Sequence, residues 1–367
     1  MTTRPSRLRA VVCGTTFGQT YLNGLTSLPE HFELAGILAR GSPFARACAE
    51  RHRVPLYTAV EQLPPAIDLA CVVVRSGVVG GAGTALAKAL LERGVHVLQE
   101  QPVHHDELAS LLRLARKAGC QYRLNGFYPD VAPVARFIAA ARHVLGKRRA
   151  LFLDAACSIH VLYPLIDIIG QALGGLRPWF FVLQSVAESD AGPFTCVSGR
   201  LGGVPLTLRV QNQLDPRDPD NYIHLFHQIA LGTDGGTLTL VDSHGQLLWH
   251  PRMHLERRGD GVIDLSAEHQ AVSLSVSSTI GPAAAPSYHQ VFNEYWAKAV
   301  ARGLLRFRDA ILAGSQDTAL HQYMLGAAKA WGELGMQLGP PRDIAPPDTL
   351  PLAVDGIAAH VQASVGT

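Results

Sequence analysis

Residues 9–18, with the sequence RAVVCGTTFG, decide the fold. The apolar run at residues 9–13 predicts a buried strand, and the pattern at residues 19–28 predicts a helix directly after it. Glycines in the turn between them let the backbone bend tightly and approach a pyrophosphate at a helix N-terminus. The turn is one residue shorter than the usual G-x-G-x-x-G, and Thr16 stands near the expected second glycine. Strand, glycine turn and helix in this order predict nucleotide binding, and the residues expected to hold the cofactor are Gly14, Thr15, Thr16, Phe17 and Gly18.

The same alternation of strand and helix continues to residue 125. Further strands are predicted at residues 32–38, 69–74, 96–99 and 122–125, and further helices at residues 43–52, 85–93 and 106–118. Alternating elements of this kind are typical of βαβ units on a parallel sheet. Gly94 and Gly119 follow two of the helices, where a left-handed cap needs no Cβ. We therefore expect an α/β Rossmann domain over residues 1–125.

From residue 126 to residue 367 the pattern changes, and at this length two domains are the normal expectation. Strands of a large, mainly antiparallel sheet are predicted at residues 206–210, 236–241, 246–250 and 271–276. Helices are predicted at residues 288–312 and 319–337, with the last ones returning to the first domain. We expect an α+β domain over residues 126–367, with the substrate bound against it.

Composition excludes several classes of protein. Hydrophobic residues make up 47%, charged residues 17%, and the net charge is only +2. This balance provides no general attraction to nucleic acid or to an acidic membrane. No apolar run has the length of a signal segment or a membrane span, so a cytoplasmic protein is expected.

Cysteines and histidines do not predict a metal site. The six cysteines lie apart from one another without a CxxC pair, which predicts buried free thiols. His224 and His227 would lie on opposite faces of a strand, and His250 and His254 form no convincing ligand pair either. We expect no metal.

The end of the second predicted strand indicates which cofactor is bound. An NAD site usually places a carboxylate there for the ribose 2′-hydroxyl. This chain instead has Arg40, Gly41 and Ser42, and the guanidinium and hydroxyl both suit a 2′-phosphate. NADPH is therefore the expected cofactor. Arg75 and Ser76, at the end of the third predicted buried strand, are expected to contact it as well.

Several motifs then resemble a known family. Glu100-Gln101-Pro102 resembles the Glu-Lys-Pro segment of the sugar dehydrogenases typified by glucose-fructose oxidoreductase and inositol dehydrogenase, in which the lysine is catalytic. Here Gln101 replaces that lysine. A wider set of segments is similar to the thiazolinyl imine reductases of the yersiniabactin and pyochelin siderophore pathways. They are residues 12–18, 21–23, 55–57, 73–76, 80–84, 94–97, 127–129, 162–163, 214–216 and 218–220, together with Glu100, Pro102, His104 and Asp167. The likeness extends from about residue 9 to residue 250.

The resemblance implies a reaction and partners. The expected activity is NADPH-dependent reduction of a thiazoline C=N to a thiazolidine, with hydride going to carbon and a proton to nitrogen. The substrate would be held as a thioester on a carrier protein of a nonribosomal peptide synthetase. A homodimer through the C-terminal sheet is also implied.

Two residues are candidate proton donors. Tyr128 follows the strand at residues 122–125, at the edge of the sheet where ligands bind, and the family treats the matching tyrosine as the general acid. His104 is the rival, because an imidazole is the better acid at neutral pH. A packing tyrosine and a capping histidine are the structural alternatives to these two roles.

Other residues of the matched segments have expected roles too. Glu100 is expected to fix the nicotinamide ribose, and Gln101 to orient the substrate or the carboxamide of the cofactor. Tyr163 is expected to line the substrate cleft, while Asp167 is expected to be structural. Pro164 stands where the wider family has a histidine, which disfavours alcohol oxidation. A sugar or cyclitol dehydrogenase and a non-catalytic NADPH sensor or scaffold remain the alternative functions.

Overall fold

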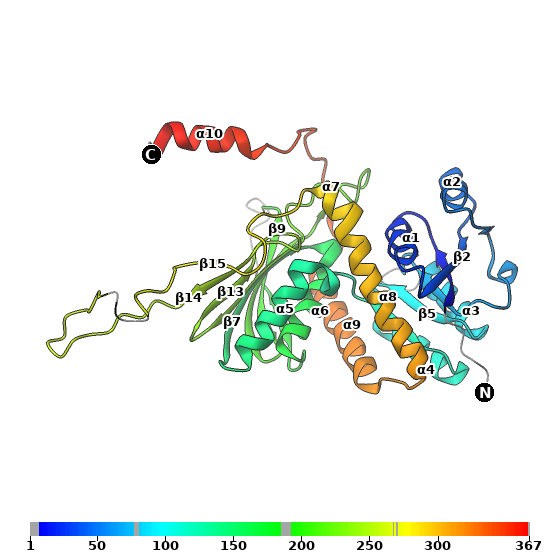
Figure 1. Ribbon diagram of the computed structural model, residues 1–367, viewed down its shortest axis with the longest axis horizontal. Coiled ribbons are helices and arrows are strands. Elements are labelled where there is room, and N and C mark those ends of the chain that lie inside the picture. Colours follow the sequence, from blue (N-terminus) through cyan, green and yellow to red (C-terminus); the bar gives the residue numbers. More distant parts are fainter. Residues whose placement is uncertain (1–6, 77–80, 185–191, 267, 269–270, 366–367) are drawn as a thin grey trace.

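The computed structural model describes residues 7–76, 81–184, 192–266, 268 and 271–365. The chain forms two joined units, each built on its own sheet (Figure 1). A parallel Rossmann-type sheet comes first and a large, mainly antiparallel sheet follows, which confirms the predicted fold class.

The first sheet has six parallel strands in the order β3-β2-β1-β4-β5-β6. They are β1 (Leu8–Cys13), β2 (Phe32–Leu38), β3 (Leu56–Tyr57), β4 (Leu69–Val72), β5 (His96–Glu100) and β6 (Tyr122–Asn125). The helices between them are α1 (Gly18–Thr26), α2 (Pro43–His52), α3 (Ala82–Glu92) and α4 (His105–Ala118). Strand β1 lies between β2 and β4, so the strand order reverses at β1, and a crevice for a ligand forms at its carboxyl end.

The second sheet has eight strands in the order β15-β14-β13-β12-β7-β10-β9-β8. They are β7 (Ala150–Ser158), β8 (Phe180–Leu183), β9 (Phe194–Leu201), β10 (Val204–Gln211), β12 (His227–Thr233), β13 (Gly236–Leu240), β14 (Leu247–Pro251) and β15 (Ser278–Thr279). Strands β7 and β10 pair in parallel, and the other pairs are antiparallel. A small separate sheet joins β11 (Gln213–Leu214) to β16 (Arg342–Asp343).

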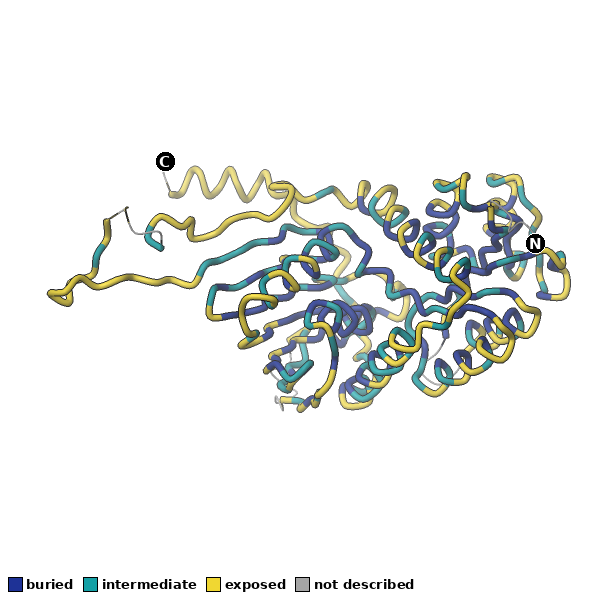
Figure 2. Tube along the Cα trace, turned by 60° about the horizontal axis from the view of Figure 1, so that its bottom comes forward, coloured by how far each residue is buried: buried dark blue, intermediate teal, exposed yellow. Residues whose placement is uncertain are grey.

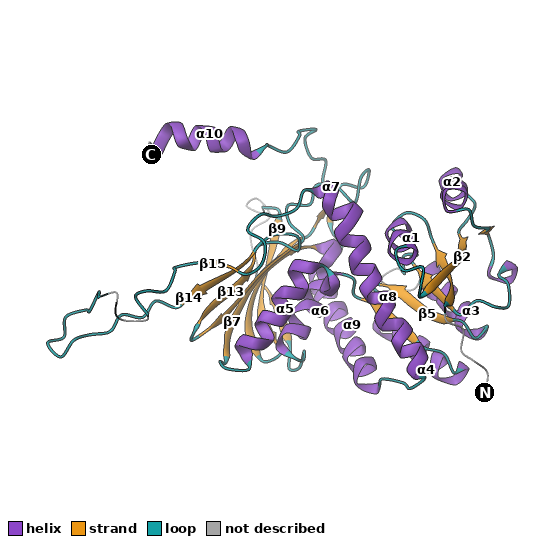
Figure 3. Cartoon of the chain, in the orientation of Figure 1, coloured by secondary structure: helices purple, strands orange, loops and turns teal. Residues whose placement is uncertain are grey.

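Helices cover one face of the eight-stranded sheet (Figure 3). They are α5 (Ala132–Leu145), α6 (Leu162–Leu173) and α9 (Thr318–Leu338). Phe181 of β8 is buried, whereas Phe180 and Val182 on either side of it are 52% and 49% exposed. Because successive strand residues point to opposite faces, the other face of the sheet at β8 carries uncovered apolar side chains.

The last helices return to the first unit, where α8 (Trp296–Ala313) packs on α1 and α9 packs on α4. A short helix α7 (Tyr288–Gln290) and a π-helical turn at Val291–Tyr295 precede α8. The α1–α8 crossing is close, since a Cβ added to Gly24 would lie 2.7 Å from Cγ1 of Val300. A glycine at residue 24 therefore sets how near the two units come.

One predicted strand is wrong. Residues 271–276 form turns and bends within an arm (residues 252–266 and 271–277) that extends beyond the sheet, and Val276 in it is 90% exposed (Figure 2). A strand needs a hydrogen-bonded neighbour, and β15, at this edge, is only two residues long. After α9 the chain includes β16 and then α10 (Val354–Val365), a helix with no buried residue.

Candidate active site

The turn after β1 has the shape of a phosphate-binding turn. Gly14 has φ +92°, and a Cβ there would lie 2.5 Å from the carbonyl oxygen of Val73 on the neighbouring strand segment. Helix α1 begins at Gly18, and its N-cap residue, Phe17, makes no side-chain hydrogen bond to the first turn. The first backbone N–H groups of a helix lack partners within it, so this helix start after the carboxyl end of β1 suits a pyrophosphate.

The residues predicted to select the cofactor lie at the end of β2. Arg40 is exposed, and Gly41 has φ +76°. The Ser42 hydroxyl accepts a hydrogen bond from the backbone N–H of Ala45 at 3.1 Å, so it caps α2. Its own hydrogen stays available to a phosphate oxygen.

The end of β4 contributes Arg75 and Ser76, while residues 77–80, including Gly80 of the family-like segment, lie outside the described part of the chain. The Ser76 hydroxyl is buried and accepts from Nε2 of Gln99 at 2.8 Å. Arg75 reaches the second unit, where its guanidinium lies 3.4 Å from Oδ1 of Asp220. Arg75 thus forms a bridge across the crevice between the two units.

A buried hydrogen-bonded chain stands behind the crevice. The Tyr21 hydroxyl on α1 donates to the carboxylate of Glu100 at the end of β5 and accepts from Nδ2 of Asn125 at 2.5 Å. Burial raises the pKa of Glu100 to about 8, although the hydrogen bonds from Tyr21 and Gln101 lower it in part. Glu100 is therefore largely protonated at neutral pH. The sequence motif identified Glu100, but only the fold shows that Tyr21 binds it and that Asn125 in turn binds the Tyr21 hydroxyl.

Gln101 has an unused acceptor. Its Nε2 lies 3.5 Å from Oε1 of Glu100, while its own Oε1 is buried without a hydrogen-bond partner among the described residues. A buried oxygen of this kind costs free energy unless a ligand donates to it. The carboxamide N–H of a nicotinamide would be a suitable donor, so the residues at this edge of the sheet fit the cofactor.

Tyr128 lies at the junction of the two units, in the short 3₁₀ turn Tyr128–Asp130 after β6. Its ring contacts Phe127 on one side, with centroids 5.0 Å apart, and His227 of β12 on the other, at 4.8 Å. Burial raises the pKa of its hydroxyl well above the usual value, and the Glu100 and Asp242 carboxylates raise it further. The phenol therefore stays protonated over the whole physiological range.

His104 has a structural task. It is the N-cap of α4, where its Nδ1 accepts from the backbone N–H of Asp106 at 3.4 Å. Its side chain is 35% exposed and also lies 3.9 Å from the Asp106 carboxylate. Among the two predicted donors, Tyr128 is buried between the units and His104 is on the rim.

Two histidines that no sequence motif linked to Tyr128, His227 and His244, pack around its ring. His227 donates from Nε2 to the carbonyl of Val161 at 2.8 Å and accepts at Nδ1 from Ser243 at 2.7 Å, and burial lowers its pKa to about 4. His244 accepts at Nε2 from the indole N–H of Trp296 at 3.0 Å. Both imidazoles are held by partners far away in the sequence, so no local motif marks them.

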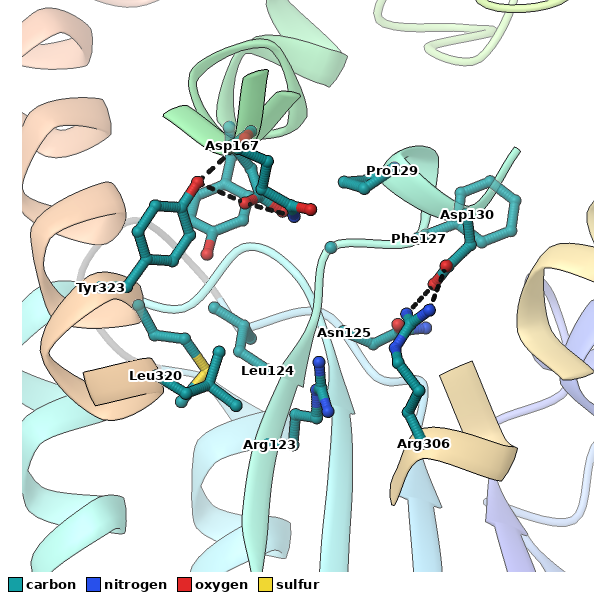
Figure 4. Close-up of a pocket in the computed structure, with 14 residues that line it drawn as sticks. Arg123, Leu124, Asn125, Phe127, Pro129, Asp130, Asp167, Arg306, Leu320 and Tyr323 are labelled. Atoms are coloured by element: carbon teal, nitrogen blue, oxygen red, sulfur yellow. Dashed lines mark hydrogen bonds and ion pairs between the residues drawn. The ribbon is translucent and has the colours of Figure 1, made fainter. Parts of the chain in front are cut away.

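A small polar cavity of about 50 Å³ lies behind the turn that carries Tyr128 (Figure 4). Asp167 reaches it from α6 and accepts at Oδ1 from the hydroxyl of Tyr323 at 2.9 Å. A Cβ on Gly126 would lie 2.2 Å from Oδ2 of Asp167, which shows how closely the turn packs. Tyr163, predicted to line a substrate cleft, is 3% exposed in the wall of this inner cavity.

An ion pair ties the same turn to α8. Arg306 donates from Nη1 to Oδ1 of Asp130 at 2.6 Å, and its second nitrogen donates to the other carboxylate oxygen. The Asp130 side chain is only 7% exposed, so this two-point contact is shielded from water on the acid side. The turn that carries Tyr128 is therefore fixed from both α6 and α8.

The described part of the chain shows no metal cluster, no disulfide and no helix fit to span a membrane. Within the described residues, no cluster of three or more His, Cys, Asp or Glu side chains is arranged to hold a metal. The six cysteines are free thiols, and all but Cys196 are buried. No helix in the described part of the chain has both the length and the apolar character needed to cross a membrane.

Comparison with known proteins agrees with this geometry. Residues 8–126 match the family described as "Oxidoreductase family, NAD-binding Rossmann fold". Residues 148–250 match the family described as "Thiazolinyl imine reductase Irp3-like, C-terminal". No curated protein matches the sequence. The two family matches support an NAD(P)-dependent oxidoreductase.

Solved structures share the fold over nearly the whole chain. A dehydrogenase from Chromobacterium violaceum aligns with a TM-score of 0.63 and 15% identity, over 90% of this chain and 94% of that one. The UDP-N-acetylglucosamine 3-dehydrogenase of Acidithiobacillus ferrooxidans gives 0.60 and 16%, over 88% and 96%. A biliverdin reductase from Synechocystis, solved with biliverdin and NADP+, gives 0.61 and 14%, over 91% and 99%. At these identities the likeness shows the fold alone.

Proposed function

Starting from an NAD-binding oxidoreductase domain joined to a C-terminal domain of the imine reductase type, we propose that the protein reduces a thiazoline C=N to a thiazolidine with NADPH. The observation that carries this proposal is the buried phenol of Tyr128, held between the two units beside Glu100 and Asp242. A glutamine at residue 101, where sugar dehydrogenases have a catalytic lysine, leaves no lysine base in that motif. The site is thus suited to donating a proton rather than to removing one from an alcohol.

The first unit would bind and orient the cofactor. The turn at Gly14 and the start of α1 would receive the pyrophosphate, and Arg40 with Ser42 the 2′-phosphate. The orphaned Oε1 of Gln101 would accept from the carboxamide, and protonated Glu100 would lie beside the ribose. When bound, NADPH supplies the hydride to the imine carbon.

Tyr128 would supply the proton. A phenol with a raised pKa is a weak acid toward a resting imine, but the nitrogen becomes a strong base as hydride reaches the neighbouring carbon. The O–H bond of Tyr128 then breaks, the N–H bond forms, and the C=N double bond becomes single. Solvent returns a proton to the phenolate after the product leaves. The product contains two hydrogens more than the substrate.

The partners are part of the same proposal. The substrate would arrive as a thioester on a carrier protein of a nonribosomal peptide synthetase, in the manner of siderophore assembly. A second copy of the chain would cover the uncovered face of the large sheet, where Phe152 and Phe180 are 43% and 52% exposed. A Phe180→Glu variant that stays dimeric in sedimentation would contradict that interface.

One incubation tests the activity. A carrier-bound hydroxyphenyl-thiazoline is incubated with the protein and NADPH. The product is then released from the carrier, and its mass is measured by mass spectrometry. A gain of two hydrogens supports the proposal. Oxidation of free sugars or cyclitols with NADP+ would instead indicate the dehydrogenase alternative, and tight NADPH binding without turnover a sensor or scaffold.

A further inference from the structure

A second, larger cavity lies in the substrate unit. Its volume is about 400 Å³, and it opens to solvent. It is lined by Gly192, Pro193, Gln213, Tyr222, His224, Arg342, Ile344, Ala345, Pro346 and Pro347, here called the Arg342 pocket. None of these ten residues is acidic, and one of them, Arg342, carries a guanidinium. The pocket therefore suits an apolar chain that carries a negative charge.

The walls of the Arg342 pocket are firmly held. Buried Gln211 donates from Nε2 to the carbonyl of Tyr222 at 2.8 Å and accepts at Oε1 from the N–H of His224 at 3.0 Å. The rings of Tyr222 and His224 contact each other with centroids 5.2 Å apart. On the other side, the backbone N–H of Arg342 donates to Asn212 at 3.0 Å and that of Ile344 to Leu214 at 2.8 Å.

The Arg342 guanidinium is available to a ligand. Its single described hydrogen bond goes to the carbonyl of Gly192 at 3.4 Å, and no carboxylate among the described residues forms an ion pair with it. A guanidinium has five N–H donors in a planar fork that matches phosphate oxygens. Within the described residues, most of those donors have no partner and could bind an anion in the pocket.

The pocket is close to the proton donor along the chain. The ring of Phe226 lies 6.1 Å from the ring of Tyr128. His224, in the pocket wall, is two residues before Phe226, and a two-residue step spans at most about 7 Å. The pocket wall at His224 is thus two residues from a ring that packs on Tyr128, so an extended tether on a substrate bound at Tyr128 would reach it.

We propose that the Arg342 pocket holds the phosphopantetheine tether of the carrier-bound substrate, with Arg342 binding its phosphate. This inference rests on the proposed function. The aromatic and proline-rich walls contact the aliphatic part of the tether, and the guanidinium neutralises the phosphodiester. The pocket lies in the second unit, away from β2, so it is separate from the predicted 2′-phosphate site at Arg40.

A binding measurement tests the pocket without any turnover. Calorimetric titration compares 4′-phosphopantetheine, pantetheine and inorganic phosphate. We expect the phosphorylated arm to bind about tenfold more tightly than pantetheine, and Arg342→Gln to abolish that difference. Arg200→Gln is the matched control, because Arg200 is an exposed arginine that also donates to one backbone carbonyl, that of Gly203, at 2.7 Å. The proposal is overturned if the wild-type protein binds 4′-phosphopantetheine no more tightly than pantetheine, or if Arg342→Gln keeps the preference. It is also overturned if inorganic phosphate binds as tightly as 4′-phosphopantetheine.

Kinetics separate this inference from the proposed function. With a carrier-tethered thiazoline, Arg342→Gln should raise KM about tenfold, while kcat and KM for the short N-acetylcysteamine thioester stay unchanged. Ala345→Trp, which fills the pocket from an exposed position, should act in the same way. If the wild type reduces neither substrate, the proposed function fails and the titration still decides on the pocket. If it reduces both and the variants do not raise the carrier KM, only the pocket assignment fails.

Discussion

The ring of Tyr128, at the end of the first unit, lies edge-on against the ring of His227 in the large sheet, with centroids 4.8 Å apart. His227 is itself fixed at both nitrogens, by Ser243 and by the carbonyl of Val161. The proposed proton donor is therefore positioned by the second unit as much as by the first. Its hydroxyl makes no hydrogen bond to any described residue, so its hydrogen is free for the substrate.

Tyr128→Phe tests the proton donor. Removing the hydroxyl should lower kcat by about a hundredfold or more, because positioned general acids contribute on that scale. The affinity for NADPH, measured by fluorescence titration, should stay the same, since the ring and its packing remain. His104→Asn is the control: asparagine is also a good N-cap, so α4 keeps its cap while the imidazole is lost. If His104→Asn lowers kcat while Tyr128→Phe does not, the proton donor is His104 and not Tyr128.

Arg40→Ala tests the choice of cofactor. Loss of the guanidinium should raise KM for NADPH about tenfold and leave KM for NADH unchanged, because only NADPH has the 2′-phosphate. Arg51→Ala, at the far end of α2, should change neither value. Equal effects of Arg40→Ala on both cofactors would show that the arginine does not contact the 2′-phosphate.

Glu100 should make stability depend on pH. Its folded-state pKa of about 8 lies above the ordinary 4.5, so between these values the folded protein binds the extra proton. The free energy of unfolding should then fall as pH rises from about 4.5 to about 8 and level off above that. Glu100→Gln should abolish this fall in the free energy of unfolding, which is on the order of a few kcal/mol.

Thermal unfolding checks this prediction. The Tm advantage of Glu100→Gln over the wild type should widen between pH 5 and pH 8. Parallel pH curves for the two proteins would mean that the carboxyl is ionised in the folded state at neutral pH.

A pair of identical substitutions tests the contact between the units. Gly24→Ala places a Cβ 2.7 Å from Val300 and should destabilise the protein by about 1–3 kcal/mol through overpacking. Gly335→Ala, also in a helix, meets nothing within 4 Å and should stabilise by up to about 1 kcal/mol. Differential scanning calorimetry gives both values. A stable Gly24→Ala protein would indicate that α1 and α8 are not closely packed in solution.

Much of the first unit was predictable because its signals are local. Strands β2 and β6 and helix α2 have the predicted bounds, since buried parallel strands are continuous apolar runs and glycines or prolines punctuate them. The second unit was harder. Strands β7, β8, β9 and β12 were not predicted, and residues 271–276 were wrongly assigned to a strand, because strand pairing depends on distant neighbours.

The sequence alone determined the Rossmann-type domain, the cofactor turn, the absence of a lysine at residue 101 and the candidate Tyr128, because each rests on neighbouring residues. Only the tertiary structure decided that Tyr21 binds Glu100, 79 residues away, and that Arg306 binds Asp130, 176 residues away. It also decided that His104 is a cap and that Tyr163 is enclosed. Burial and long-range contacts set protonation and position, and no local pattern of residues records either.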